Sequence, residues 1–189
     1  GKTAIALGVM EFLVRNLQKV ALFRPVIGQP EKNGEADGII DLLTKTYQLQ
    51  LAAEEMFAYT VDQARSLVAE GRHADLLEGI LDRYKALEAS HDFVLCLGTD
   101  FMGASSAFEL DINAEIANNI GCPLLIVANA HMKEIGEIEK TCQFAVESFE
   151  EKGCDIIALL LNQTPKQLQN TIVDYLKPRL RDKLDYIYS

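Results

Sequence analysis

Short runs that are apolar from end to end alternate along this chain with amphipathic helical segments. The clearest runs are residues 93–97, 123–128 and 156–161, and a further short run covers 19–23, where Lys19 precedes four apolar residues. A strand with no polar residue on either face is buried on both faces, as in a parallel sheet covered by helices. The sequence therefore predicts an α/β fold of three layers, helix–sheet–helix (αβα), with a mostly parallel sheet. At 189 residues, 49% of them hydrophobic, we expect one domain over 1–189.

Capping residues indicate where two of the helices begin. Thr60 and Gln63 form a capping box ahead of an apolar helical stretch. Thr164 is expected to cap the final helix, with Pro165 at its first position and Gln167 completing a second box. Glycines are expected to end three helices, at Gly71, Gly121 and Gly153.

The order and limits of the strands follow from the same patterns. Pro25 should end the run 19–23, because proline cannot donate to a sheet ladder. The run 93–97 is expected to be the central strand, and residues 184–188 to open a further one. Ligands of open α/β sheets bind outside the carboxyl ends of the strands, so polar residues there are candidates for function.

The chain begins with Gly1-Lys2-Thr3, the closing triplet of the phosphate-binding loop G-x-x-x-x-G-K-[ST]. In that loop, amides at a helix N-terminus and the Lys bind phosphate, while the Thr hydroxyl binds Mg²⁺. Apolar residues recur at helical spacing over 4–17, so the triplet lies where a helix starts. A frayed N-terminus is the simpler interpretation of three residues. If the motif is real, we expect the chain to be truncated before residue 1.

Several polar residues follow the predicted strands. Arg24 is a candidate phosphate ligand, or a surface arginine in a loop. Asp37 begins a helix, where a carboxylate complements the helix dipole; alternatively it binds Mg²⁺. Asp100 follows the run 93–97 and is the best placed acid for a metal, with a turn as the alternative. Asn162 could bind a nucleobase edge through its amide, or only form a turn.

Composition restricts the remaining classes of function. A net charge of −10 opposes nucleic acid as a partner, because duplex binding depends on clustered Lys and Arg. The apolar runs fall short of the roughly 20 residues that a membrane helix needs, so we expect no membrane partner. Four cysteines without C-x-x-C spacing suggest buried free thiols and a cytoplasmic protein. No spacing predicts a catalytic residue.

The ordered set of motifs resembles the dethiobiotin-synthetase-like, P-loop NTPase-like domain at the N-terminus of long bacterial phosphate acetyltransferases. The residues that carry the resemblance are Gly1-Lys2-Thr3, Phe23-Arg24-Pro25-Val26 with Gln29 after it, the segment 95–101, the segment 113–117 followed by 123–127, and the run 157–162. The resemblance implies a parent enzyme that exchanges an acetyl group between coenzyme A and phosphate in a separate C-terminal acetyltransferase domain. It also implies that this domain is a regulatory and assembly module, and we expect a homo-oligomer.

The sequence differs at two positions from the catalytically active ligases related to this family, dethiobiotin synthetase and the cobyrinic acid amidating enzymes. Those enzymes have Lys where Arg24 stands and a Glu where Leu97 stands. Leucine cannot bind Mg²⁺, so ligase chemistry requires Asp100 to take over that role.

Three functions therefore remain open. The first is a non-catalytic regulatory module that binds ATP, with Mg²⁺, or another anionic effector. The second is a stand-alone ATP-dependent carboxylate ligase resembling dethiobiotin synthetase or cobyrinic acid amide synthase. The third is a scaffold that binds no nucleotide.

Overall fold

The structure is a computed structural model that describes residues 1–28, 37–99, 106–180, 184 and 186–189, and side chains within 106–109 are not among them. The chain divides into two compact units, and each is considered by itself. The N-terminal unit comprises Thr3–Glu109. The C-terminal unit comprises Gly1–Lys2 and Leu110–Ser189.

The N-terminal unit is built around a parallel three-stranded sheet in the order β2-β1-β3. Strand β1 therefore lies in the middle of this sheet, and the prediction that 93–97 is the central strand is wrong for the residues that the structure describes. The elements are α1 (Lys2–Asn16), β1 (Val20–Ile27), α2 (Gly38–Tyr47), the 3₁₀ turn η1 (Ala53–Glu55), β2 (Phe57–Thr60), α3 (Val61–Ala69), α4 (His73–Glu88) and β3 (Phe93–Cys96).

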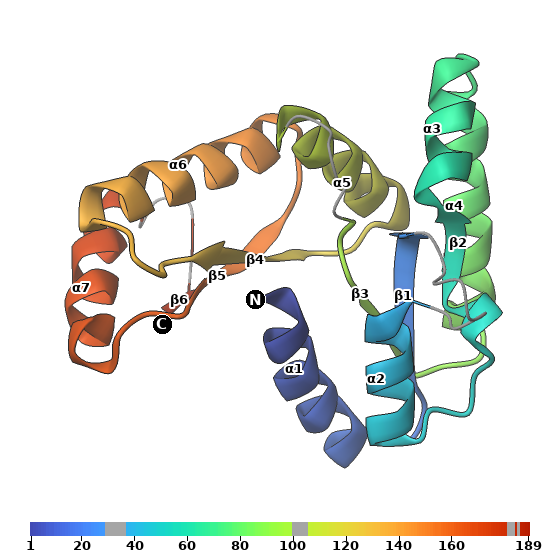
Figure 1. The fold of residues 1–189 in the computed structure, drawn as a ribbon, viewed down its shortest axis with the longest axis horizontal. Coiled ribbons are helices and arrows are strands. Elements are labelled where there is room, and N and C mark those ends of the chain that lie inside the picture. The colour runs from blue at the N-terminus through green and yellow to red at the C-terminus, as the bar shows by residue number, and fades with distance from the viewer. Residues whose placement is uncertain (29–36, 100–105, 181–183, 185) are drawn as a thin grey trace. The chain divides into compact units, whose positions relative to one another are not determined.

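Helices cover both faces of this sheet (Figure 1). On one face, side chains of α1 and α2 such as Met10 and Ile40 pack in one buried cluster with Leu22 of β1. The two helices are also joined by a hydrogen bond from Tyr47 Oη of α2 to the carbonyl of Leu7, 2.7 Å long. On the other face, the ring of Phe23 lies 6.2 Å from that of Tyr84 in α4. The predicted αβα layering and the α/β fold class are confirmed in this unit.

Strand β1 passes through Pro25 and continues to Ile27, so the prediction that Pro25 ends it is wrong. The amide of Arg24 donates to the carbonyl of Met56, on the β2 side. Successive amides of a strand point to opposite sides, so the position of Pro25 faces the β3 side. Strand β3 has already ended there at Cys96, and the missing N–H of proline costs no ladder bond.

The C-terminal unit contains a second parallel sheet, in the order β4-β5-β6. Strands β4, β5 and β6 lie at the three runs predicted at 123–128, 156–161 and 184–188. The elements are α5 (Ser106–Ile120), β4 (Leu124–Asn129), α6 (Ile135–Glu151), β5 (Ile156–Asn162), the 3₁₀ turn η2 (Lys166–Leu168), α7 (Gln169–Leu180) and β6 (Tyr186–Tyr188).

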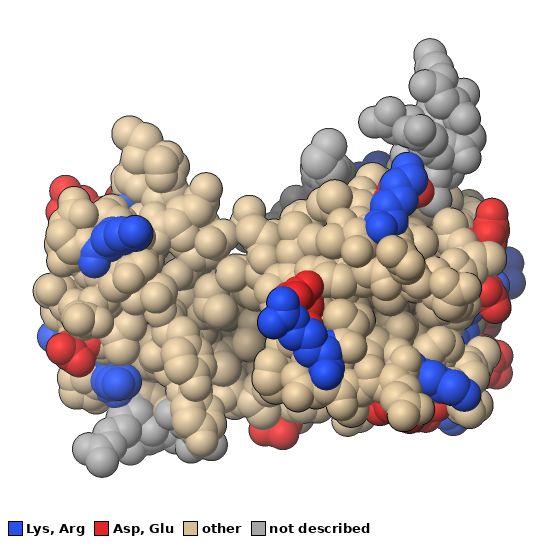
Figure 2. Space-filling view, turned by 90° about the horizontal axis from the view of Figure 1, so that it is seen from below, with Lys and Arg blue, Asp and Glu red and all other residues tan. Residues whose placement is uncertain are grey.

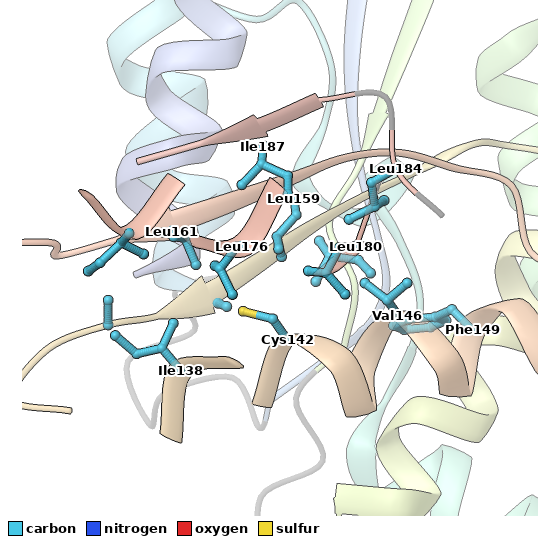
Figure 3. Close-up of a cluster of buried hydrophobic side chains, with 14 of the residues drawn as sticks. Ile138, Cys142, Val146, Phe149, Leu159, Leu161, Leu176, Leu180, Leu184 and Ile187 are labelled. Atoms are coloured by element: carbon cyan, nitrogen blue, oxygen red, sulfur yellow. The ribbon is translucent and has the colours of Figure 1, made fainter. Parts of the chain in front are cut away.

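The core of this unit lies between the sheet and helices α6 and α7. Figure 3 shows Leu159 of β5 and Ile187 of β6 beside Cys142 of α6 and Leu176 of α7, all buried in one cluster. Alternate residues of each strand enter this cluster. The side chains that face away from it include those of Leu125 and Tyr186, which are half exposed.

Most of the predicted helix ends are confirmed. Thr60 and Gln63 form the expected capping box, and Gly121 and Gly153 follow their helices with φ of 73° and 77°. The predicted start of the final helix is wrong. The Thr164 hydroxyl donates to the carbonyl of Leu161 instead of accepting a helix amide, and α7 begins only after η2.

Gly79 in α4 allows close contact with β2. A Cβ atom built on Gly79 would overlap the phenol oxygen of Tyr59 and lie 2.9 Å from its Cζ and 3.1 Å from its Cε2. The ring of Tyr59 therefore rests directly on the backbone of α4, and its hydroxyl reaches the carbonyl of Asp75 at 3.4 Å.

We predict that Gly79→Ala lowers the free energy of unfolding by about 1–2 kcal/mol, because the Tyr59 ring must be displaced. Gly8→Ala is the matched control, since a Cβ at this helical glycine meets no atom within 4 Å. It should be neutral or stabilising by up to about 1 kcal/mol. Urea unfolding of the two variants measures this difference, and equal stability would contradict the packing described.

Candidate functional site

A charged residue lies inside β1. Arg24 is only 7% exposed, although its neighbours along the strand are apolar. It alternates with Leu22, so its side chain lies on the sheet face that α1 and α2 cover. The guanidinium forms an ion pair with Asp37. The alternative prediction, a surface arginine in a loop, is therefore wrong: Arg24 is buried within a strand.

Asp37 connects this pair to the start of α2. It is the N-cap residue, and its Oδ1 accepts from the amides of Ile39 at 3.0 Å and Ile40 at 3.4 Å. The same oxygen is the partner of Arg24. One carboxylate thus satisfies two helix amides and neutralises a buried cation. The sequence analysis offered a place at the helix N-terminus as one of two roles for Asp37, but it did not predict the ion pair with Arg24.

Arg24 retains unused hydrogen-bonding capacity. Its Nε is buried and makes no hydrogen bond with any residue that the structure describes. An unmet buried donor costs about 1–3 kcal/mol, and more for a charged group. An additional acceptor at this point would relieve that cost, and a phosphate or carboxylate oxygen is the acceptor that arginine binds best.

Two threonines lie close to the ends of these elements: Thr3 at the start of α1, and Thr99 beyond the carboxyl end of β3. Thr3 is in the first turn of α1 and is half buried. Thr99, which follows β3, is buried, and its hydroxyl donates to the carbonyl of Val26 at 3.4 Å. Thr99 thereby links the ends of the two strands, a role that no sequence signal indicated. Asp100 lies outside the described residues.

The C-terminal unit brings together Gly1 and Asn162, two of the residues predicted to bind a cofactor. A Cβ on Gly1 would lie 3.9 Å from Nδ2 of Asn162, the last residue of β5. Asn162 pairs in register with Asn129, the last residue of β4. Asn129 was not predicted, although two consecutive buried strands ending in Asn are a signal in the sequence. Lys2, the first residue of α1, belongs to the same unit.

Asn129 itself serves a turn. Its Oδ1 accepts from the amide of His131 at 2.9 Å, and the amide of Ala130 donates to the carbonyl of Asn162. These bonds fix the chain as it leaves β4 beside the end of β5. Asn162 therefore lies in a defined backbone setting next to Gly1.

Clusters of metal-binding side chains and cysteine thiols are two further kinds of chemical group to consider among the described residues. Within them, no group of three or more His, Cys, Asp or Glu side chains could hold a metal ion. Burial raises the pKa of the Cys142 thiol to about 11 and also raises the pKa of Cys122 and Cys154. These thiols are protonated at neutral pH and are poor nucleophiles.

The surface carries mixed charge. Figure 2 shows Lys and Arg side chains separated from one another and interspersed with Asp and Glu on the face in view. In the part of the chain that the structure describes, no helix is both long enough and apolar enough to span a membrane.

Comparison with known families identifies the class of protein. The profile of the family described as AAA domain matches residues 1–183. The chain belongs to this family, whose P-loop NTPase-like fold agrees with the parallel α/β architecture described above.

Similar proteins are named phosphate acetyltransferase. The chain is 43% identical to the one from Nitratidesulfovibrio vulgaris over 163 residues, covering 86% of this chain and 23% of that protein. It is 31% identical to the one from Synechocystis sp. over 183 residues, covering 97% of this chain and 26% of that protein. The protein from Helicobacter pylori is 30% identical over 146 residues, which are 75% of this chain and 26% of the relative.

The chain thus spans about a quarter of the length of these relatives. The resemblance to a P-loop NTPase-like domain of bacterial phosphate acetyltransferases is confirmed. The predicted binding residues are not tested by these similarities.

We predict that Arg24→Met lowers the free energy of unfolding by about 3 kcal/mol, the lower end of the range for a broken buried pair. The lower end applies because Asp37, after losing Arg24, still accepts hydrogen bonds from the amides of Ile39 and Ile40. Arg15→Met is the control, since Arg15 pairs with Glu11 on the exposed side of α1. It should change stability by about 0.5 kcal/mol or less. A loss for Arg24→Met as small as the control's would show that the pair contributes nothing to folding.

Proposed function

We propose that this chain is the N-terminal regulatory and assembly domain of a phosphate acetyltransferase. The support is the shared sequence with proteins of that name and the share of their length, about a quarter, that the chain matches. In the parent protein, a C-terminal acetyltransferase domain of the same polypeptide exchanges the acetyl group between coenzyme A and phosphate. The present domain acts on that partner, in a cytoplasmic homo-oligomer, without carrying out chemistry itself.

We further propose that the domain binds ATP or another anionic effector. The observation that carries this proposal is the buried Arg24 with an unmet Nε, on the sheet face where α2 begins. A nucleotide offers phosphate oxygens to such a donor, and helix N-termini favour the same negative charge. Gly1, Lys2 and Thr3, at the start of α1, are the further phosphate ligands that we propose.

The remaining ligand groups follow from residue chemistry. Asn162, beside Gly1, offers one amide donor and one acceptor to a nucleobase edge. The oxygen groups of Thr3, Asp37 and Asp100 are of the kind that Mg²⁺ prefers, so these three residues are the proposed metal ligands. When bound, Mg²⁺ would neutralise phosphate charge. Leu97 stands where ligases use a Glu, which favours binding without turnover.

We predict that calorimetric titration with ATP and Mg²⁺ detects binding to this chain and that Lys2→Ala weakens it at least about tenfold. A lost charge-assisted contact to phosphate is worth roughly 1.5–3 kcal/mol. Lys19→Ala is the control, because Lys19 is an exposed lysine that follows the same helix. It should leave the affinity unchanged.

Other outcomes decide between the alternatives. Absence of heat and of any thermal shift at millimolar nucleotide would overturn effector binding and leave only the assembly role. Release of ADP that depends on an added carboxylic acid, and that Lys2→Ala abolishes, would establish the ligase instead.

A further inference from the structure

Arg24 and Asp37 form a neutral pair at the point where an anionic ligand is proposed to bind. The guanidinium has five N–H donors, and the counter-charge recorded for it is one oxygen of Asp37. Both side chains are about nine-tenths buried, with exposures of 9% for Arg24 and 11% for Asp37. A second anion that reached Arg24 would therefore lie close to the Asp37 carboxylate, away from bulk water.

Adding an anion without moving Asp37 is unfavourable. Two like charges around one cation repel each other strongly in a poorly solvated setting. Exchange is favoured over addition, because a phosphate that replaces Asp37 keeps Arg24 neutralised and can also supply an acceptor for Nε.

The two members of the pair differ in what they lose on separation. Asp37 still accepts from the amides of Ile39 and Ile40 and remains at the positive end of α2. Arg24 has no other recorded counter-charge among the described residues and needs a new anion. Separation of the pair is therefore unfavourable mainly because Arg24 loses its counter-charge, and an anionic ligand bound to Arg24 replaces that charge.

From these contacts we propose that Asp37 is an internal competitor for the anionic ligand. It holds Arg24 in the absence of ligand and gives it up to a small oxyanion of the phosphate class. Asp37 is thus a residue that limits affinity and sets the ligand concentration at which the domain responds. This inference rests on the proposed anion binding and adds its regulation.

The test is calorimetric titration with inorganic pyrophosphate in EDTA, so that contacts through a metal do not contribute. Asp37→Asn keeps a good N-cap residue but removes the charge, and it should bind pyrophosphate at least about tenfold more tightly than the unaltered chain, a gain of about 1.4 kcal/mol. Asp41→Asn is the matched control. Asp41 lies in the first turn of the same helix and pairs with Lys45, so its affinity should stay within about twofold.

A further variant identifies the cation involved. Arg24→Gln combined with Asp37→Asn should lose the gain, because the competitor acts through Arg24. If Asp37→Asn does not fold alone, its helical circular dichroism should be recovered by pyrophosphate and not by chloride at equal ionic strength. Failure of that recovery would contradict the proposal.

The two proposals fail in different ways. If the unaltered chain binds pyrophosphate and Asp37→Asn binds it no more tightly, the competition is wrong and the binding function stands. If neither the unaltered chain nor any variant binds pyrophosphate or ATP with Mg²⁺, both the proposed binding function and the proposed competition are wrong.

Discussion

A guanidinium buried in the middle of a parallel sheet must be neutralised, and much of the N-terminal unit follows from that requirement. Arg24 lies in β1, between β2 and β3, and is covered by α1 and α2. Removing such a charge from water costs several kcal/mol unless a partner is held in place. The partner is Asp37, which is fixed because it also caps α2. The start of α2 is therefore tied to β1 by charge as well as by apolar packing.

In each unit, considered by itself, polar groups lie in or near the strands of its sheet. Parallel strands that are apolar along their length have polar residues only where they end. In the N-terminal unit, Thr99 follows β3 and bonds the carbonyl of Val26. Arg24, paired with Asp37, is an exception because it lies within β1. In the C-terminal unit the polar residues at strand ends are Asn129 and Asn162, opposite each other in register, with Gly1 beside Asn162. Each unit thus has hydrogen-bonding side chains held by backbone contacts near its strands.

The sequence predicted the elements of the fold better than their limits. Local signals sufficed for the apolar strands, for the capping box at Thr60 and for the glycines at 121 and 153. Pro25 was misjudged because its effect depends on where a neighbouring strand ends, and Thr164 because its hydroxyl has a second local partner, the carbonyl of Leu161 three residues earlier. The missing amide of Pro25 faces a side where β3 has ended, and the Thr164 hydroxyl found an acceptor in β5. The Arg24–Asp37 pair joins a strand to a helix start 13 residues later (37 minus 24), and no local pattern specifies such a contact.

We propose that an anionic ligand binds where α1 and α2 begin and engages Arg24. Amide NMR spectra of the ¹⁵N-labelled chain during titration with ATP and Mg²⁺ test it most directly. We expect the largest chemical-shift changes at Thr3, Arg24 and Ile39, and no change at Gly71 in the turn between α3 and α4. The largest changes at Gly71 or another distant turn, or no change at any amide, would contradict it.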